Sequence, residues 1–166
     1  MFWRNLLATS ATTVVAAAAG SLATASGVRS DWYEQLHKPD FQPPPEAFPI
    51  AWTLLYADIA LTSAGVLTEL DGRADVGSDQ ARGAARQYRR ALTLNLALNA
   101  GWCWTFFTRR DTSLATVTAL ALTASSTDLA RRAAAGRPRH GLALAPYAAW
   151  CAFATALSGR IHELNR

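Results

Sequence analysis

The sequence is poor in charge and in the side chains that usually carry chemistry. Only 17% of its 166 residues are charged, whereas an average soluble domain has about a quarter. It has two cysteines and three histidines, and no histidine has a cysteine, histidine or glutamate at the spacing of a metal site. G-x-S-x-G, P-loop and glycine-rich dinucleotide motifs are also missing. These absences predict neither a metal centre nor a catalytic group supplied by the polypeptide, and they disfavour a soluble protein.

The basic residues and the cysteines point away from other classes. The net charge of +4 could suggest a nucleic-acid partner, but the arginines form short clusters at the ends of apolar runs, not one helical face. This distribution is typical of membrane flanks, so no nucleic acid is expected. Cys103 and Cys151 both have apolar neighbours. We expect two buried small hydrophobic side chains and no disulfide or metal pair.

Apolar residues, which make up 51% of the chain, form five long segments separated by charges, glycines and prolines. Each is close to the roughly 20 residues that cross a hydrocarbon core of about 30 Å. Many of their residues are Ala, Thr or Ser, which let helices approach closely in lipid. The sequence predicts an all-α integral membrane bundle of five transmembrane helices, forming one domain over residues 1–166. The expected spans are approximately 2–27, 48–70, 87–107, 112–130 and 142–161.

The first segment also imitates a signal peptide, because Arg4 and an apolar run precede Ala23-Thr24-Ala25. A signal would usually carry more than one basic residue there, so we expect a retained span; cleavage would leave four spans.

If the first segment is retained, ten basic residues fall on the N-terminal side of the membrane and six on the other. This bias favours a cytoplasmic N-terminus. Gly20 and Gly27, with nearby alanines, are candidates for a dimer face.

The connection between the first two segments is unusually aromatic and contains a proline run, Pro43 to Pro45. Three consecutive prolines fix φ and remove three donors, which predicts a stiff, extended lid. Pro49 suits the first turn of the helix that follows. Trp52 and Tyr56 are one turn apart in that helix, and they suit either an interfacial aromatic belt or the wall of a site.

The third and fifth segments place polar and aromatic groups deep in the expected membrane. Asn95, Asn99 and Trp102 share one helical stripe. At 1.5 Å per residue, Asn99 and Asp58 lie at similar depths, about 12 and 13 Å from the lid side. They could form an interhelical hydrogen bond or contact a ligand. Trp150 is too deep for an interfacial belt, and its indole N–H needs an acceptor.

These residues resemble the TspO/MBR family, the tryptophan-rich sensory proteins, over nearly the whole chain. Three motifs carry the resemblance in order, and the sequence has them as follows: Trp32-Tyr33, Leu36, Lys38-Pro39, Phe41, Pro43-Pro44, Phe48-Pro49, Ala51-Trp52-Thr53 and Leu55-Tyr56; Leu98-Asn99, Trp102 and Phe106-Phe107; Pro146-Tyr147, Trp150, Ala154 and Leu157. The resemblance implies a five-helix bundle in a bacterial cell membrane, often a homodimer, with a ligand cavity capped by the Pro/Trp-rich loop. It implies no required cofactor, and a porphyrin such as protoporphyrin IX or haem, or a lipid-like molecule, as the ligand.

By motif position, the ligand-binding residues implied are Trp32, Trp52, Tyr56, Asn99, Trp102, Trp150 and Ala154, with Lys38 and the loop aromatics as the lid. Two positions depart from the family. Thr123 stands where relatives often have tryptophan in the fourth span. Leu157-Ser158-Gly159 replaces the usual Leu-Asn-Tyr, so that motif gives no ground to predict cholesterol binding.

The function expected from this resemblance is tetrapyrrole binding for sensing, regulation or transport of porphyrins. One alternative is an enzyme that degrades porphyrin with light and oxygen, in which Trp52 and Trp150 take part in redox steps. A second alternative is a small-molecule or proton-coupled transporter, because an intramembrane carboxyl such as Asp58 can relay protons. The absence of an internal repeat disfavours a transporter.

Overall fold

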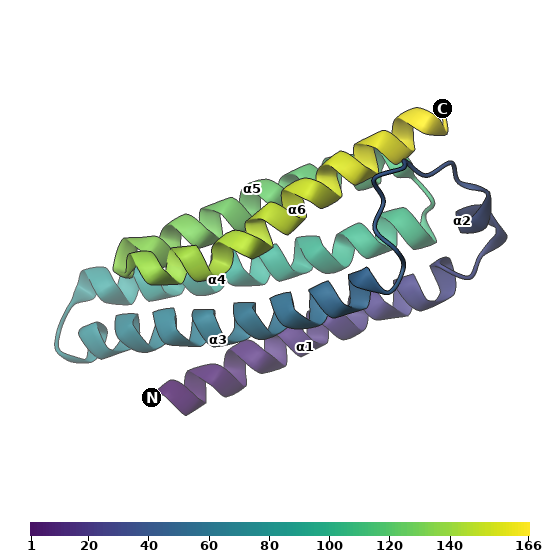
Figure 1. Ribbon diagram of the computed structural model, residues 1–166. Coiled ribbons are helices and arrows are strands. Elements are labelled where there is room, and N and C mark those ends of the chain that lie inside the picture. The colour runs from purple at the N-terminus through teal and green to yellow at the C-terminus, as the bar shows by residue number, and fades with distance from the viewer.

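The computed structural model describes residues 1–166, and all of its regular structure is helical. Five helices are long: α1 (Phe2–Gly27), α3 (Ala47–Asp75), α4 (Asp79–Cys103), α5 (Thr112–Gly136) and α6 (Pro138–Leu164). Two elements are short: α2 (Asp31–Gln35) and a π-helix (Trp104–Thr108) that continues α4. The long helices lie side by side, with the two chain termini at opposite ends (Figure 1). The all-α prediction is confirmed.

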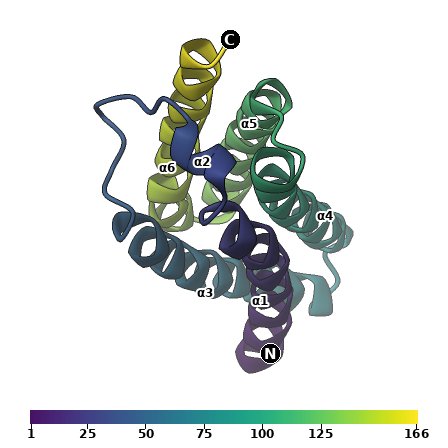
Figure 2. The same ribbon diagram turned by 90° about the vertical axis from the view of Figure 1, so that its right-hand side faces the viewer.

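We call the end that holds α2 and the C-terminus the lid end, and the other the far end. Residues 36–46, which connect α2 to α3, are called the lid. The lid runs from α2 past the C-terminal end of α6 and then out to the start of α3 (Figure 2). It has no regular secondary structure, as expected of a proline-rich segment.

Three of the long helices, α1, α3 and α6, are long and apolar enough to cross a membrane, with mean hydropathies of 1.6, 1.5 and 1.3. The other two contain more polar residues. The first half of α4 carries Arg82, Arg86, Arg89 and Arg90, and α5 is rich in threonine and serine. That α4 and α5 also cross the membrane stays a prediction.

The connection between α3 and α4 is shorter than its polar composition suggests. The glycines and charges of residues 72–83 are typical of a solvated connector, but α3 continues to Asp75 and α4 begins at Asp79. Gly77 has φ = 97°, a left-handed conformation that favours glycine. The Ser78 hydroxyl then accepts a hydrogen bond of 3.2 Å from the backbone N–H of Ala81 and caps α4. Gly77 and Ser78 together make a tight turn between the two helices, although the composition of this segment is typical of a longer loop.

Helix α1 changes its packing partner along its length. Near the far end it lies against α3, where the Thr9 hydroxyl donates to the Ala60 carbonyl oxygen at 2.9 Å. Near the lid end it lies against α4 and the π-helix, where the Trp104 indole N–H donates to the Ala19 carbonyl oxygen at 2.9 Å. Figure 2, viewed from the lid end, shows the near ends of α1 and α3 apart from each other.

In its lid half, α1 packs closely against α4 and the π-helix at two glycines. A Cβ added to Gly20 would lie 3.1 Å from the Cys103 sulfur, and one added to Gly27 would overlap the Phe107 side chain. Both glycines therefore face the inside of the chain. The suggestion that they form a dimer face is wrong, because the surface that they leave open is occupied by α4 and the π-helix.

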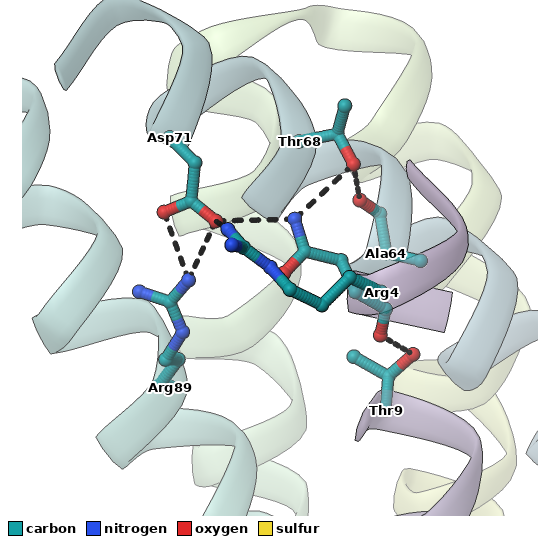
Figure 3. Close-up of polar contacts among 7 residues, drawn as sticks. Arg4, Thr9, Ala64, Thr68, Asp71 and Arg89 are labelled. Carbon is teal, nitrogen blue, oxygen red and sulfur yellow. Dashed lines mark hydrogen bonds and ion pairs between the residues drawn. The ribbon is translucent and has the colours of Figure 1, made fainter. Parts of the chain in front are cut away.

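At the far end, one carboxylate joins three helices (Figure 3). Asp71 of α3 accepts hydrogen bonds from the Arg89 guanidinium of α4, at 2.7 and 2.8 Å, and from the Asn5 amide of α1, at 3.1 Å. The Arg4 guanidinium is 3.9 Å away. The Asn5 amide also donates to the Thr68 hydroxyl at 3.3 Å. Because the Asp71 side chain is only 13% exposed, these contacts fix where α1 begins relative to α3 and α4.

Candidate functional site

A cavity of about 590 Å³ lies at the lid end. This volume is within the roughly 300–1,000 Å³ of typical small-molecule sites. Its aromatic walls come from α2, α3, α4 and the π-helix, and α1 and α6 contribute mostly small and aliphatic side chains. The aromatic residues that line it are Tyr33, Phe48, Trp52, Tyr56, Trp102, Phe106 and Phe107. Such a wall suits a flat, largely apolar ligand.

The start of α3 supplies one wall. Pro49 lies in the first turn of the helix, where its missing N–H costs nothing. One turn apart, Trp52 and Tyr56 then stack with ring centroids 5.4 Å apart. Both side chains line the cavity. Their i, i+4 spacing in the sequence predicts that the two side chains lie on the same helical face.

The opposite wall depends on the π-helix. Its i to i+5 hydrogen bond runs from the Arg109 N–H to the Trp104 carbonyl oxygen, at 2.9 Å. This wide turn brings Phe106 and Phe107 to the cavity together, with ring centroids 5.0 Å apart. Trp102 stacks on Phe106 at 5.5 Å. Single π-turns within helices are frequent at functional sites, and this one carries two wall residues that were not among the predicted ligand contacts.

A chain of hydrogen bonds leads from the cavity into the core. The Tyr56 hydroxyl donates to the Asn99 side-chain oxygen at 2.6 Å, and the Asn99 amide donates to the Tyr147 hydroxyl at 3.5 Å. The Tyr147 hydroxyl donates to the Asn95 side-chain oxygen at 2.7 Å, and the Asn95 amide donates to the Ser125 hydroxyl at 3.3 Å. The chain joins α3, α4, α6 and α5. Only its first two members, Tyr56 and Asn99, line the cavity.

The structure brings four of the eight proposed ligand-binding residues to the cavity wall: Trp52, Tyr56, Asn99 and Trp102. The Trp102 indole N–H donates to the Ser158 hydroxyl at 3.2 Å. Ser158 also lines the cavity, so the residue that departs from the usual family motif has a structural partner here.

The other four proposed residues lie behind the wall. Trp32 packs edge-on against Phe106 at 5.6 Å. Trp150 packs edge-on against Trp52 at 6.4 Å, and Ala154, one turn further along α6, is partly buried. The Lys38 ammonium donates to the Tyr33 carbonyl oxygen at 2.7 Å and lies 4.4 Å from the centre of the Tyr33 ring. None of these four lines the cavity, but Trp32, Trp150 and Lys38 contact residues that do.

Asp58 is not the partner of Asn99. One of its carboxyl oxygens accepts a hydrogen bond of 2.8 Å from the Thr62 hydroxyl, one turn along α3. The other oxygen is buried and has no hydrogen-bond partner. Asp58 and Asn99 have similar depths in the sequence pattern, but Asn99 faces Tyr56 and Tyr147, and Asp58 does not line the cavity.

The lid is held in place from both sides. Asn165, which follows α6, accepts a 2.9 Å hydrogen bond from the His37 N–H and donates one of 2.9 Å to the His37 carbonyl oxygen. Pro39 is buried, and Gln42 and Pro45 reach the cavity. Burial raises the pKa of the Tyr33 phenol above its usual value of 10.0, so this wall residue is neutral at physiological pH.

The hydrogen-bond chain gives a testable expectation for stability. Asn95 has no exposed surface, and replacing it with alanine leaves the Tyr147 hydroxyl without its acceptor. We expect Asn95→Ala to lower the free energy of unfolding by about 1 kcal/mol, since buried hydrogen bonds between membrane helices are worth about that much. Thermal unfolding in detergent measures the change. Thr127→Ala is the control, because the exposed Thr127 hydroxyl bonds only within its own helix; an equal loss in both variants would contradict the expectation.

Comparisons with known proteins identify the family of the chain. The model of the TspO/MBR family matches residues 8–164. A tryptophan-rich sensory protein from Cereibacter sphaeroides is 32% identical over 153 residues, which cover 90% of this chain and 87% of that protein. YtaB, an uncharacterized membrane protein from Bacillus subtilis, is 30% identical over 145 residues, which cover 83% of each. The tryptophan-rich protein TspO from Bacillus cereus is 28% identical over 141 residues, or 81% of this chain and 80% of that protein. With a family match over almost its whole length and three helices apolar enough to span a bilayer, the chain is an integral membrane protein that belongs to the TspO/MBR family.

Proposed function

We propose that this protein binds a porphyrin-type tetrapyrrole in the lid-end cavity and takes part in sensing or regulating porphyrins in a bacterial membrane. The observation that carries the proposal is a cavity of about 590 Å³ whose opposite walls are aromatic. A porphyrin is a flat macrocycle with two aromatic faces, and it gains contact area from rings on both sides.

The polar groups of the cavity are few and in defined places. The Tyr56 hydroxyl gives its proton to Asn99, which leaves its oxygen lone pairs available to a ligand donor. Gln42, in the lid, supplies an amide near the outer end of the site. A ligand that is apolar over most of its surface and polar at its edge matches this distribution.

Titration with protoporphyrin IX tests the proposal. We expect saturable quenching of tryptophan fluorescence, with a parallel shift in the absorption of the porphyrin. Trp52→Ala removes one wall and should weaken binding about tenfold, which corresponds to about 1.4 kcal/mol. Absorption gives the Kd of this variant independently of the lost fluorophore.

Trp3→Ala is the matched control. Trp3 is 74% exposed and lies in the first turn of α1, far from the cavity, so its loss should leave the Kd unchanged. The absence of saturable binding by the wild-type protein, or an unchanged Kd in Trp52→Ala, would contradict porphyrin binding in this cavity.

One contact favours a second candidate function, the oxidation of bound porphyrin by molecular oxygen under light. Trp52 lines the cavity and packs edge-on against Trp150, with ring centroids 6.4 Å apart. If Trp52 loses an electron during the oxidation, Trp150 is near enough to replace it. Illumination of the complex in the presence of oxygen should then give a new chromophore, and Trp150→Phe should slow its formation without changing the Kd. A chromophore that forms at the same rate in this variant would count against the tryptophan pair.

A cytoplasmic N-terminus, a homodimer and proton transport through Asp58 stay predictions.

A further inference from the structure

The part of the lid nearest α2 and α6 is fixed by hydrogen bonds. The two hydrogen bonds between Asn165 and the His37 backbone tie the lid to α6, and the Lys38 ammonium ties it to α2. Within the lid, the Gln42 N–H donates to the Pro39 carbonyl oxygen at 2.9 Å. A ligand that crossed the lid would have to break several of these contacts. The consecutive prolines Pro43 to Pro45 also restrict the backbone of the lid, so it has little freedom to move while the contacts remain.

The cavity is open on the side between α1 and α3. Ser21, Pro45 and Pro49 line the cavity and are nevertheless exposed, and Val28 lines it with 39% of its surface exposed. Ser21 and Val28 lie at the lid end of α1, and the two prolines lie at the junction of the lid and α3. We call these four residues the side opening.

The cause of the opening is the change of partner along α1. Its far half is held to α3 through Asn5 and Thr9, and its lid half is drawn to α4 by the missing side chains of Gly20 and Gly27. Two helices that touch at one end and lean apart at the other leave a wedge between them. The ends of α1 and α3 are accordingly separated when viewed from the lid end (Figure 2).

The surroundings of the opening change from charged to apolar along the helices. At the lid end, the exposed residues Arg29 and Glu46 follow Val28 and Pro45. Further along α1 and α3, which are both apolar enough to cross a membrane, the neighbours Leu22 and Ile50 are 71% and 63% exposed. Exposed apolar side chains on helices that are apolar enough to span a bilayer are expected to face lipid.

We propose that ligands pass between the bilayer and the cavity through the side opening, with the lid remaining in place. The molecules admitted are then those that dissolve in the membrane first, which means flat amphiphiles with most of their surface apolar. This inference concerns the route; it takes the porphyrin as its ligand from the function proposed above.

Rates separate this route from passage through the lid. In vesicles of phosphatidylcholine that contain the protein, protoporphyrin IX binding is followed by stopped-flow tryptophan fluorescence. Ser21→Trp should narrow the side opening, slow association about tenfold and slow dissociation as well, whereas a loss of affinity alone would speed dissociation. Leu22→Trp adds the same bulk one residue away on the lipid face and should change neither rate. Asn165→Ala unties the lid and should also leave both rates unchanged.

The opposite pattern would overturn the inference. If ligands cross the lid, Asn165→Ala accelerates both rates and Ser21→Trp leaves them unchanged. The same comparison can be made without porphyrin. Cys103 lines the cavity, and we expect N-ethylmaleimide added to the vesicles to label it. In a Cys151→Ser background, Ser21→Trp should slow this labelling and Leu22→Trp should not. Equal labelling in both, or none in the parent protein, argues against the side opening, whereas slowed labelling without porphyrin binding contradicts only the proposed ligand.

Discussion

We expect Gly27→Ala to destabilise the protein by about 3 kcal/mol, at the upper end of the cost of overpacking a core. The added methyl group would overlap the Phe107 side chain close to its backbone; the three nearest atoms are all in Phe107. A side chain can avoid a clash cheaply when only its tip is involved. Here the π-helix itself has to move, because the Cβ of Phe107 is among the atoms contacted.

The same substitution should also disturb the cavity. Phe107 lines it and packs edge-on against Trp102, with centroids 6.2 Å apart. Gly27→Ala therefore couples a loss of stability to weaker ligand binding. Thermal unfolding in detergent and the protoporphyrin IX titration measure the two effects. Gly101→Ala is the matched control, since no atom lies within 4 Å of its added Cβ, and alanine stabilises a helix relative to glycine by up to about 1 kcal/mol. Equal effects of the two substitutions would show that Gly27 has no special packing role.

Asp71→Ala should have the second largest effect, a loss of about 2 kcal/mol. Removal of one partner of a buried ion pair costs about 3–5 kcal/mol, and the 44% exposure of the Arg89 side chain reduces this cost by solvent screening. Asn5, which is only 4% exposed, also loses an acceptor. The substitution releases α1 from α3 and α4 at the far end, the only end where α1 and α3 are joined by side-chain hydrogen bonds.

Asp79→Ala provides the comparison for Asp71→Ala. Asp79 also pairs with an arginine, Arg82, but its side chain is 91% exposed. Exposed pairs of this kind are worth at most about 1 kcal/mol. Thermal unfolding of both variants in detergent, at low and high salt, measures the difference. An Asp71→Ala variant as stable as Asp79→Ala would mean that the far-end contacts do not hold α1.

The helices and half of the proposed site could be predicted from the sequence, because both depend on local periodicity. Apolar runs bounded by charges mark the long helices. Within them, i, i+3 and i+4 spacing puts Trp52 with Tyr56, and Asn99 with Trp102, on single faces. The same reasoning could not distinguish which face looks into the cavity and which lies behind it. Trp150 packs against Phe48 and Trp52, which line the cavity, but does not line it itself.

The remaining differences arise from contacts between residues far apart in the chain. The position of Lys38 depends on the lid, and the lid is fixed by Asn165, 128 residues from His37. The role of Gly27 depends on Phe107, and the π-helix that presents Phe107 has no compositional signature. Asp58 and Asn99 have matching depths, but rotation about each helix axis decides which side chains meet, and depth alone does not contain that information.

The wide turn at Trp104–Thr108 ties ligand contact to the length of the polypeptide. A π-turn holds one residue more than an α-turn, and successive residues of an α-helix are about 100° apart. Deleting a single amino acid here would restore a regular α-helix. Every later side chain of that segment would rotate by about 100° around the helix axis, and Phe106 and Phe107 would no longer both face the cavity. In this family, a homologue with a deletion at the π-turn is therefore expected to have a different pocket. A deletion in the turn between α3 and α4, at Val76 to Ser78, carries no such expectation.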